Sequence, residues 1–320
     1  MKRVLFVTNH VAPNRVGAFE ALAARVPLEV VAFGGPRKHG AAPADYGRLI
    51  AERDVAKEIS RGGWSAVVAG TAGRLALPAA YLAARRRGVP FVHWAALWAQ
   101  PRTPAHLAAT PLMRSIYRNA QAVVTYGPHV SAHVQAHGAR NVFIAPQSVD
   151  NAFWSAPAGE PTDAFTVLFV GREAAEKGLP VLRAAWVGEG RLEVVTGGAT
   201  REELRNFYAR AHVVVMPSIR TRSFREPWGL VANEAMNQRT AIIASEEVGA
   251  AAGGLIRHEH NGLVVPAGDA QALRAAIARL REDRALTNRL AGNGADDVKA
   301  YSHDAWADGF HSALRNVGGC

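Results

Sequence analysis

The chain has 320 residues, of which 49% are hydrophobic and 20% are charged; this excludes a largely disordered protein and suits two α/β domains. Cysteine occurs once, as Cys320, which excludes an intrachain disulfide and favours a reducing compartment. No stretch approaches the roughly 18 apolar residues of a membrane span, and the N-terminal apolar run is too short for a signal peptide. We therefore expect a cytoplasmic protein.

The net charge of +10 is unevenly distributed. Residues 1–150 hold 18 Lys and Arg against 7 Asp and Glu, whereas the remainder holds 19 against 20. One interpretation is a solvated surface in an Arg-rich protein. The other is that the first half, with its Arg85–Arg87 run, contacts an anionic partner such as a membrane leaflet or a lipid-linked phosphate. Nucleic acid is disfavoured because no nucleic-acid-binding motif accompanies the charge.

Apolar and helical segments alternate along the first 150 residues. The predicted strands are 3–8, 28–34, 65–70, 89–94, 122–127 and 142–146. Helical segments lie between them, for example at 18–26. Strands that are apolar throughout indicate a parallel sheet covered on both faces. The first domain is therefore predicted to be Rossmann-like and to span residues 1–150.

The alternation restarts after a polar, Pro-containing segment, 148–164, which is predicted to be a linker. The second series of predicted strands is 165–171, 191–197, 213–218, 240–245 and 262–268. A second doubly wound domain is thus predicted over residues 151–300. In the remaining segment, 301–320, Trp306, Phe310 and Leu314 follow each other at i, i+4 and i+8, which predicts one apolar stripe of a helix.

The most informative motif is FREPWGLVANEAM, residues 224–236. It places Glu226 and Glu234 eight positions apart, after a predicted strand and at the start of a helical segment. Such junctions bind ligands in α/β proteins because free backbone amides point out of the strand ends. Carboxylates accept hydrogen bonds from hydroxyl groups, while amides bind phosphates. The combination is suited to a nucleotide-sugar.

A second motif, residues 170–186, follows the first strand of the second domain. Gly171 allows a tight turn, and Arg172 and Lys177 flank the start of the next helix, where Pro180 suits the first turn. Two cations beside a helix start would bind a diphosphate well. Taken alone, however, the pattern favours an ordinary loop with a solvated Arg and Lys.

In order and spacing, the segments VGREAAEKGLPVL, MPS, REPWGLVANEAM, AIIAS and GLVVPAGD resemble the retaining GT-B glycosyltransferases of the family-four type. The first half resembles them only in architecture and in its opening strand, which is followed by a loop expected to contain Gly17. The resemblance implies two Rossmann-like domains facing across a cleft. The first, 1–150, would bind the acceptor and the second, 151–300, the nucleotide-sugar, with helix 301–320 packing back on the first domain.

The resemblance also implies roles for individual residues. Arg172 and Lys177 would hold the donor diphosphate, Glu226 would contact hydroxyls of the transferred sugar, and Glu234 would accept from the ribose hydroxyls. The backbone beside the sugar and phosphate would come from Gly171, Trp228, Gly229 and Leu230. In the first domain, Gly17 would approach the diphosphate, and the acceptor side is predicted to include Asn9, His10 and Arg15.

Two positions depart from the family pattern. Members commonly carry Gly between the Glu-bearing helix and the next strand, where this chain has Arg239; we expect a different turn there. Members also use a His of the first domain on the donor sugar. His93 is the candidate for that catalytic position, although a His within an apolar strand is commonly a core residue.

The implied reaction moves a sugar from a nucleoside-diphosphate donor to a glycan, a polysaccharide precursor or a lipid-linked acceptor, with retained anomeric configuration. Preorganised cations and amides would stabilise the leaving diphosphate, so neither a metal nor a cofactor is expected. No G-x-G-x-x-G or Gly-Lys-Ser/Thr motif supports a dehydrogenase or a P-loop enzyme. A GT-B nucleotide-sugar epimerase and a non-catalytic nucleotide-sugar binding protein remain as alternatives. The oligomeric state is left open.

Overall fold

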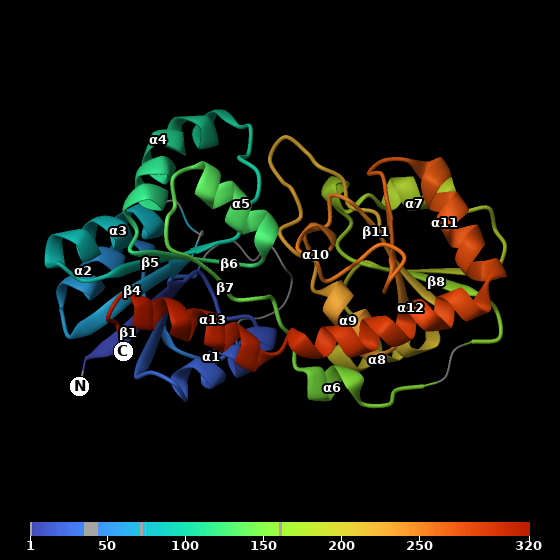
Figure 1. Ribbon diagram of the computed structural model, residues 1–320, viewed down its shortest axis with the longest axis horizontal. Coiled ribbons are helices and arrows are strands. Elements are labelled where there is room, and N and C mark those ends of the chain that lie inside the picture. Colours follow the sequence, from blue (N-terminus) through green and yellow to red (C-terminus); the bar gives the residue numbers. More distant parts are fainter. Residues whose placement is uncertain (1, 35–43, 71–72, 74, 160–161) are drawn as a thin grey trace. The chain divides into compact units, whose positions relative to one another are not determined.

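The computed structural model describes residues 2–34, 44–70, 73, 75–159 and 162–320 (Figure 1). The chain divides into two compact units. Unit 1 comprises Met1–Pro146 and His303–Cys320, and unit 2 comprises Gln147–Ser302. Each unit is built on a parallel sheet with helices on both faces, which confirms the doubly wound α/β fold predicted from the alternation of segments.

Unit 1 contains a seven-stranded sheet in the order β3-β2-β1-β4-β5-β6-β7. Its strands are β1 (Arg3–Thr8), β2 (Leu28–Ala32), β3 (Arg48–Leu49), β4 (Trp64–Gly70), β5 (Phe91–Ala95), β6 (Ala122–Thr125) and β7 (Val142–Ile144). Its helices are α1 (Val16–Ala23), α2 (Val55–Ser60), α3 (Ala76–Arg87), α4 (Pro104–Asn119), α5 (Pro128–Ala136) and α13 (His303–Asn316), with short 3-10 turns η1 (Pro13–Arg15) and η2 (Glu52–Asp54).

Alternate side chains of β1 enter the two apolar layers of unit 1. Val4 and Phe6 face the layer formed with α1 and α13, whereas Leu5 and Val7 face the layer formed with α2 and α3. In the first layer, Trp306, Phe310 and Leu314 of α13 are all fully buried. The ring of Trp306 lies 5.5 Å from that of Phe19 in α1, edge to face. The apolar stripe of residues 303–316 is therefore part of the core of unit 1.

Unit 2 contains a five-stranded parallel sheet in the order β12-β11-β10-β8-β9. Its strands are β8 (Thr166–Val170), β9 (Arg191–Val195), β10 (Val213–Met216), β11 (Ala241–Ser245) and β12 (Leu263–Val265). Its helices are α6 (Asn151–Ser155), α7 (Leu179–Ala185), α8 (Arg201–Arg210), α9 (Val231–Asn237), α10 (Gly249–Ala252), α11 (Ala270–Glu282) and α12 (Arg284–Asp297), with 3-10 turns η3 (Ala175–Lys177) and η4 (Val298–Ala300).

The segment predicted to be a linker, 148–164, is partly helical, and residues 160–161 within it lie outside the described residues. The Asp150 side chain caps α6 by accepting from the Phe153 amide at 3.0 Å. Trp154 is buried, and its carbonyl and that of Ala156 accept from the Gln238 side chain that follows α9. The start of the predicted linker is thus a structural part of unit 2.

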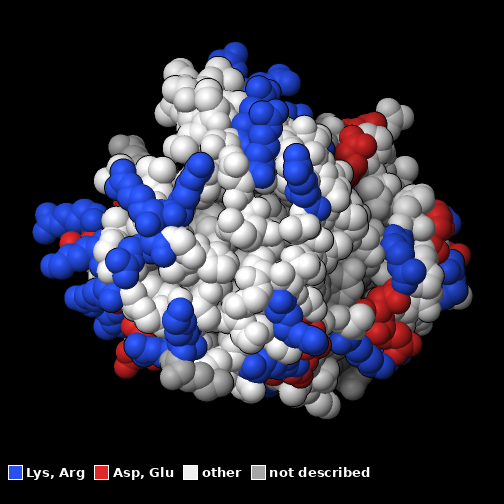
Figure 2. Space-filling view, turned by 60° about the vertical axis from the view of Figure 1, so that its left-hand side comes forward, with Lys and Arg blue, Asp and Glu red and all other residues white. Residues whose placement is uncertain are grey.

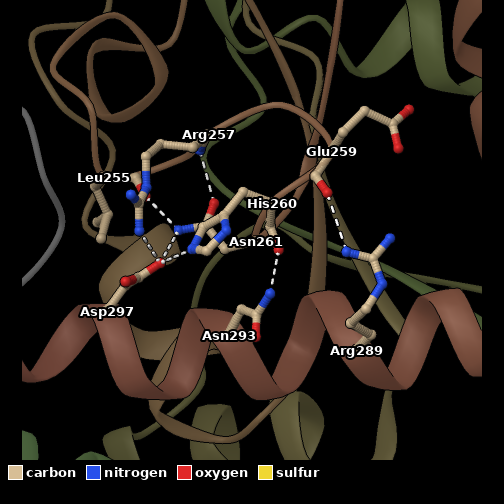
Figure 3. A network of polar contacts seen from close by, with 8 residues as sticks. All are labelled: Leu255, Arg257, Glu259, His260, Asn261, Arg289, Asn293 and Asp297. Atoms are coloured by element: carbon tan, nitrogen blue, oxygen red, sulfur yellow. Dashed lines mark hydrogen bonds and ion pairs between the residues drawn. The ribbon is translucent and has the colours of Figure 1, made fainter.

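A polar network fastens the loop between α10 and β12 to helix α12 (Figure 3). Asp297 accepts from Arg257 at 2.6 Å, from the Asn261 amide at 2.7 Å and from His260 at 3.0 Å. Asn261 also donates to the Leu255 carbonyl at 2.8 Å and accepts from the Arg257 amide at 2.7 Å. Because these groups are satisfied by one another, we assign the network to stability and not to the candidate site.

None of the helices in the described ranges combines the length and the apolar character that crossing a bilayer requires.

Candidate functional site

The predicted donor residues of unit 2 gather where the strand order of the sheet reverses. Strands β8 and β10 are neighbours, although β9 lies between them in sequence, and the chain leaves β8 and β10 toward opposite sides. Open α/β sheets bind ligands at the carboxyl ends of strands at such a reversal. Arg172 and Lys177 follow β8, and Glu226 follows β10. Residues from both sequence motifs therefore reach one edge of the sheet.

Lys177 and Glu226 form a direct ion pair. The Lys177 Nζ atom lies 2.5 Å from Glu226 Oε2, and the two side chains are only 18% and 9% exposed. The Ser218 hydroxyl, at the end of β10, donates to the same oxygen at 3.4 Å. The carboxylate is thus held by a cation and a hydroxyl just beyond the end of β10.

Two glycines explain why the loops of this site can approach so closely. A Cβ atom on Gly178, whose φ is 68°, would lie 1.8 Å from the Pro217 carbonyl oxygen, so only glycine allows the turn after Lys177 to pack on the end of β10. A Cβ atom on Gly249 would lie 2.1 Å from the Pro227 carbonyl oxygen. The second contact holds the start of α10 against the Pro-Trp-Gly turn.

Arg172 has a different environment from Lys177. Its guanidinium lies 3.0 Å from Glu176 Oε1, and its side chain is 40% exposed. A surface pair of this kind is worth little and is easily exchanged for a ligand. Gly171 beside it donates its amide to the Val195 carbonyl at 3.0 Å, which joins the ends of β8 and β9.

Glu234 lies in the first turn of α9 and is partly buried. Its Oε2 atom accepts a hydrogen bond of 2.7 Å from the Tyr208 hydroxyl of α8. Burial raises the pKa of Glu234, while the Tyr208 hydrogen bond and the charge of Arg201 act in the opposite direction. Burial, together with the contact with Glu234, raises the pKa of Tyr208 well above its ordinary value, so its hydroxyl remains a donor.

The turn that leads into α9 presents backbone amides. Within the described part of the chain, no hydrogen bond uses the amides of Gly229 and Leu230. Gly229 has a φ of 95°, and a Cβ atom there would lie 2.5 Å from Met216 Cε. Trp228 is buried, and its indole donates to the Asn233 side chain at 2.8 Å, which anchors the turn. The amides of Gly229 and Leu230 are therefore available as hydrogen-bond donors at the start of α9.

The predicted acceptor residues lie at the corresponding edge of the sheet in unit 1. Asn9 and His10 directly follow β1, whose neighbours β2 and β4 mark the reversal of strand order there. The Arg15 guanidinium lies 4.9 Å from the ring centre of Trp94, and burial lowers its pKa. Thr8 donates to the Asn9 side chain at 3.4 Å.

Gly17 lies within helix α1 and not in the loop expected after the first strand. A Cβ atom at this position would lie 2.5 Å from the imidazole of His303 in α13. The prediction of a loop is wrong, because η1 and α1 begin earlier than the sequence suggested. The absence of a side chain at Gly17 admits the start of α13.

His93 is fully buried in β5, where its Nδ1 atom lies 3.1 Å from the Ala69 carbonyl oxygen. Burial lowers the pKa of His93 to about 4, so the ring is neutral at neutral pH. Its ring packs 5.7 Å from that of Tyr117. Such an enclosed position is typical of a core residue, and a contact of His93 with the donor sugar stays a prediction.

Arg239 adopts the left-handed backbone that glycine favours, with a φ of 55°. Its amide donates to the Met236 carbonyl at 3.0 Å, and the Thr240 amide donates to the Ala235 carbonyl at 3.1 Å, which closes the end of α9. The expectation of a different turn is wrong. The turn is retained with an arginine in place of glycine.

Three side chains of the site were missed from sequence. Ser218 and Asn233 lie inside the quoted motifs. Their polar side chains could have been proposed as hydrogen-bond partners of the Glu226 carboxylate and of the Trp228 indole, respectively. Tyr208 gave no signal, because a tyrosine in an amphipathic helix is ordinarily a packing residue. Among the residues that the structure describes, no three His, Cys, Asp or Glu side chains gather as a metal site would require.

Comparison with known proteins finds similarity to glycosyltransferases over part of the chain. Residues 193–297 match the family model described as "Glycosyl transferases group 1". The D-inositol 3-phosphate glycosyltransferase of Streptomyces bingchenggensis is 34% identical over 123 residues, which cover 36% of this chain and 25% of that protein. The lipopolysaccharide core biosynthesis glycosyltransferase LpsD of Rhizobium meliloti is 28% identical over 240 residues, covering 65% of this chain and 69% of that protein.

Solved structures show the same fold over almost the whole chain. Sucrose-phosphate synthase from Thermosynechococcus elongatus has a TM-score of 0.75 at 20% identity, covering 98% of each chain. HepE from Anabaena, solved with UDP-glucose, has a TM-score of 0.72 at 15% identity, covering 98% of this chain and 99% of that chain. The fold is GT-B. The family-model match lies within unit 2.

Proposed function

We propose that this chain is a retaining, metal-independent glycosyltransferase that uses a nucleoside-diphosphate sugar as donor. The single observation that carries the proposal is the Lys177–Glu226 ion pair at the strand-order reversal of unit 2. One group of the pair supplies charge for a diphosphate, and the other accepts from sugar hydroxyls. Arg172 nearby, in an exchangeable surface pair, supplies a second cation.

The proposed chemistry is electrostatic. Negative charge builds on the leaving diphosphate as the bond to the sugar breaks, and Lys177, Arg172 and the amides of the turn before α9 would stabilise it. Glu226 is committed to Lys177 and Ser218, which suits orientation of the sugar and not nucleophilic attack. The departing phosphate would accept the acceptor proton on the same face, which retains the anomeric configuration.

The donor and acceptor classes are proposals that draw on the relatives. HepE was solved with UDP-glucose, and LpsD is named for lipopolysaccharide core biosynthesis. We propose a nucleoside-diphosphate hexose as donor and a glycan, a polysaccharide precursor or a lipid-linked acceptor bound mainly by the basic unit 1. Asn9, His10 and Arg15 are the proposed acceptor-side residues of that unit.

A contact of unit 1 with an anionic membrane surface is part of the proposal, and α4 is its centre. Residues 59–149 contain no Asp or Glu. Leu107 and Leu112 of α4 are 57% and 37% exposed, and Arg114 and Arg118 on the same helix are exposed as well. Figure 2 shows far more Lys and Arg than Asp and Glu on the forward face. Exposed leucines beside arginines suit an anionic bilayer surface.

Sedimentation with phosphatidylglycerol-containing and with neutral vesicles tests the membrane contact. The chain should sediment with the anionic vesicles only, and the double variant Leu107→Ser/Leu112→Ser should lose most of that binding. Leu49→Ser, which changes another exposed leucine of unit 1, is the matched control. Equal binding to both kinds of vesicle contradicts this part of the proposal.

A panel of nucleotide-sugars tests the catalytic proposal. A transferase releases nucleoside diphosphate slowly from its donor even without acceptor. An epimerase interconverts the sugars without release, and a non-catalytic binding protein is stabilised thermally with no turnover. Glu226→Ala should mainly lower turnover, whereas Glu234→Ala should mainly weaken nucleotide binding. Full activity in both variants would overturn the assignment of the motif.

A further inference from the structure

The hydrogen bond between Tyr208 and Glu234 joins a buried hydroxyl to a proposed ligand group. Tyr208 is fully buried in α8, and its hydroxyl donates to Glu234 Oε2 at 2.7 Å across 26 positions of sequence. Nothing in the chemistry of a packing residue requires that hydroxyl. A phenylalanine would fill the same space and would leave the carboxylate without its donor.

The Tyr208 hydroxyl is held in place by its surroundings. The Thr240 hydroxyl donates to the Tyr208 backbone carbonyl at 2.7 Å, which fixes α8 against the start of β11. The Tyr208 ring packs edge-on against Trp154 of α6 at 5.8 Å. A donor fixed on a rigid element orients its acceptor more tightly than a surface hydroxyl can.

One face of the Glu234 carboxylate is left for a ligand. Among the residues that the structure describes, Tyr208 gives the one hydrogen bond to the Glu234 side chain, and it uses Oε2. The remaining charged group that acts on Glu234 is Arg201, whose guanidinium lies 4.1 Å from the Phe153 ring centre. Oε1 and the second lone pair of Oε2 can therefore accept from two neighbouring hydroxyls.

We propose that Tyr208 is a positioning residue for the donor nucleoside: by holding Glu234 Oε2, it orients the carboxylate to accept from the vicinal hydroxyls of a ribose. The inference rests on the proposed function, because it takes the ligand of Glu234 to be a ribonucleotide. The inference adds a residue that lets the site recognise the ribose, since a nucleoside that lacks those hydroxyls cannot donate hydrogen bonds to the oriented oxygens of Glu234. Tyr208 therefore favours the binding of ribonucleotides over nucleotides that lack the 2′ and 3′ hydroxyls.

The test compares Tyr208→Phe with Tyr81→Phe. Both variants remove one hydroxyl from a buried tyrosine. The Tyr81 hydroxyl accepts a hydrogen bond from Arg85 on the same helix of unit 1. Calorimetry is run with UDP, GDP and ADP, and then with the 2′,3′-dideoxy analogue of whichever binds. Tyr208→Phe should weaken the ribonucleotide about tenfold, leave the dideoxy analogue unchanged, and raise KM for the donor with kcat within about twofold. Tyr81→Phe should change neither affinity.

The pH dependence supplies a second readout. The ribonucleotide binds the ionised carboxylate, so its affinity should fall as the pH drops through the pKa of Glu234. Loss of the Tyr208 donor should move that fall to higher pH. In a Glu234→Ala background, Tyr208→Phe should have no further effect on nucleotide affinity. This comparison tests the positioning role even if the Tyr208→Phe single variant folds poorly.

The outcomes separate the two proposals. Equal weakening of the ribonucleotide and the dideoxy analogue by Tyr208→Phe, or an unchanged affinity for both, overturns the positioning role while leaving the transferase intact. Failure of the unaltered chain to bind any nucleotide contradicts the proposed function, and the positioning role with it.

Discussion

The Lys177 ammonium and the Glu226 carboxylate, 49 positions apart in sequence, meet at 2.5 Å at the edge of the unit 2 sheet. The pair is largely enclosed, so each group needs the other for stability as long as no ligand is bound. A diphosphate would take over part of the Lys177 charge. The pair therefore links the stability of the empty site to the binding of a donor.

The first prediction separates these two roles. Lys177→Met removes the cation that pairs with the buried Glu226 carboxylate, and should lower both thermal stability and kcat/KM, the latter by about 10²–10³-fold. The double variant Lys177→Met/Glu226→Gln removes the buried charge and should recover stability without recovering activity. Calorimetric unfolding and donor kinetics measure the two effects. A double variant with wild-type kinetics would remove Lys177 from the proposed mechanism.

The second prediction concerns the folding stability that is lost because Glu234 is buried in its ionised form. Burial raises the pKa of Glu234, so its ionised form is less favourable in the folded than in the unfolded chain. Stability is lost as the pH rises above the ordinary value of 4.5. Glu234→Gln should therefore raise the Tm of unit 2 at pH 7, and the gain should vanish below pH 4.5. A lower Tm at pH 7 would contradict the direction of the shift.

The third prediction follows from the backbone of Arg239. Glycine tolerates a φ of 55° without strain, so Arg239→Gly should raise the free energy of unfolding by about 1 kcal/mol. Chemical denaturation measures the change. Gly178→Ala is the opposite case, because its φ of 68° and its contact with the Pro217 carbonyl both exclude a side chain, and it should destabilise strongly. Destabilisation by Arg239→Gly would show that the arginine side chain outweighs the strain.

The fourth prediction tests the core role of His93. Burial lowers the pKa of His93 to about 4, so as the pH falls the imidazole is protonated in the unfolded chain before it is protonated in the folded chain. The free energy of unfolding should fall as the pH decreases from 6.5 toward 4, by up to about 3 kcal/mol from this residue. His93→Asn keeps a donor for the Ala69 carbonyl but cannot titrate, so it should flatten the slope and retain kcat. A large loss of kcat with an unchanged slope would return His93 to the active site.

The strands of both units follow from the sequence because each buried strand is an apolar run. The exception is β3, Arg48–Leu49, which is short and exposed and has no apolar signal. Helix α6 was concealed by its polar, proline-containing surroundings, although Asp150 and the buried Trp154 were visible signs of a capped, packed turn. The local sequence pattern thus predicts strands and helices well where burial requires apolar side chains.

The site is predicted less completely, for a physical reason. Motif spacing identified Glu226, Glu234, Arg172 and Lys177 as candidates, but which of them pair depends on the path of two loops. That path is set by close packing at Gly178 and Gly249, which a single sequence does not reveal. At Arg239 the sequence predicted a different turn, because an arginine does not indicate the left-handed backbone that the end of α9 still requires.

The most direct test of the account is a crystal structure of the chain with the nucleoside diphosphate that it binds. We predict ribose hydroxyls within about 3 Å of Glu234 and diphosphate oxygens within about 3 Å of Lys177 and Arg172. A nucleotide bound elsewhere, or one whose diphosphate avoids Lys177 and Arg172, would contradict the proposed donor site.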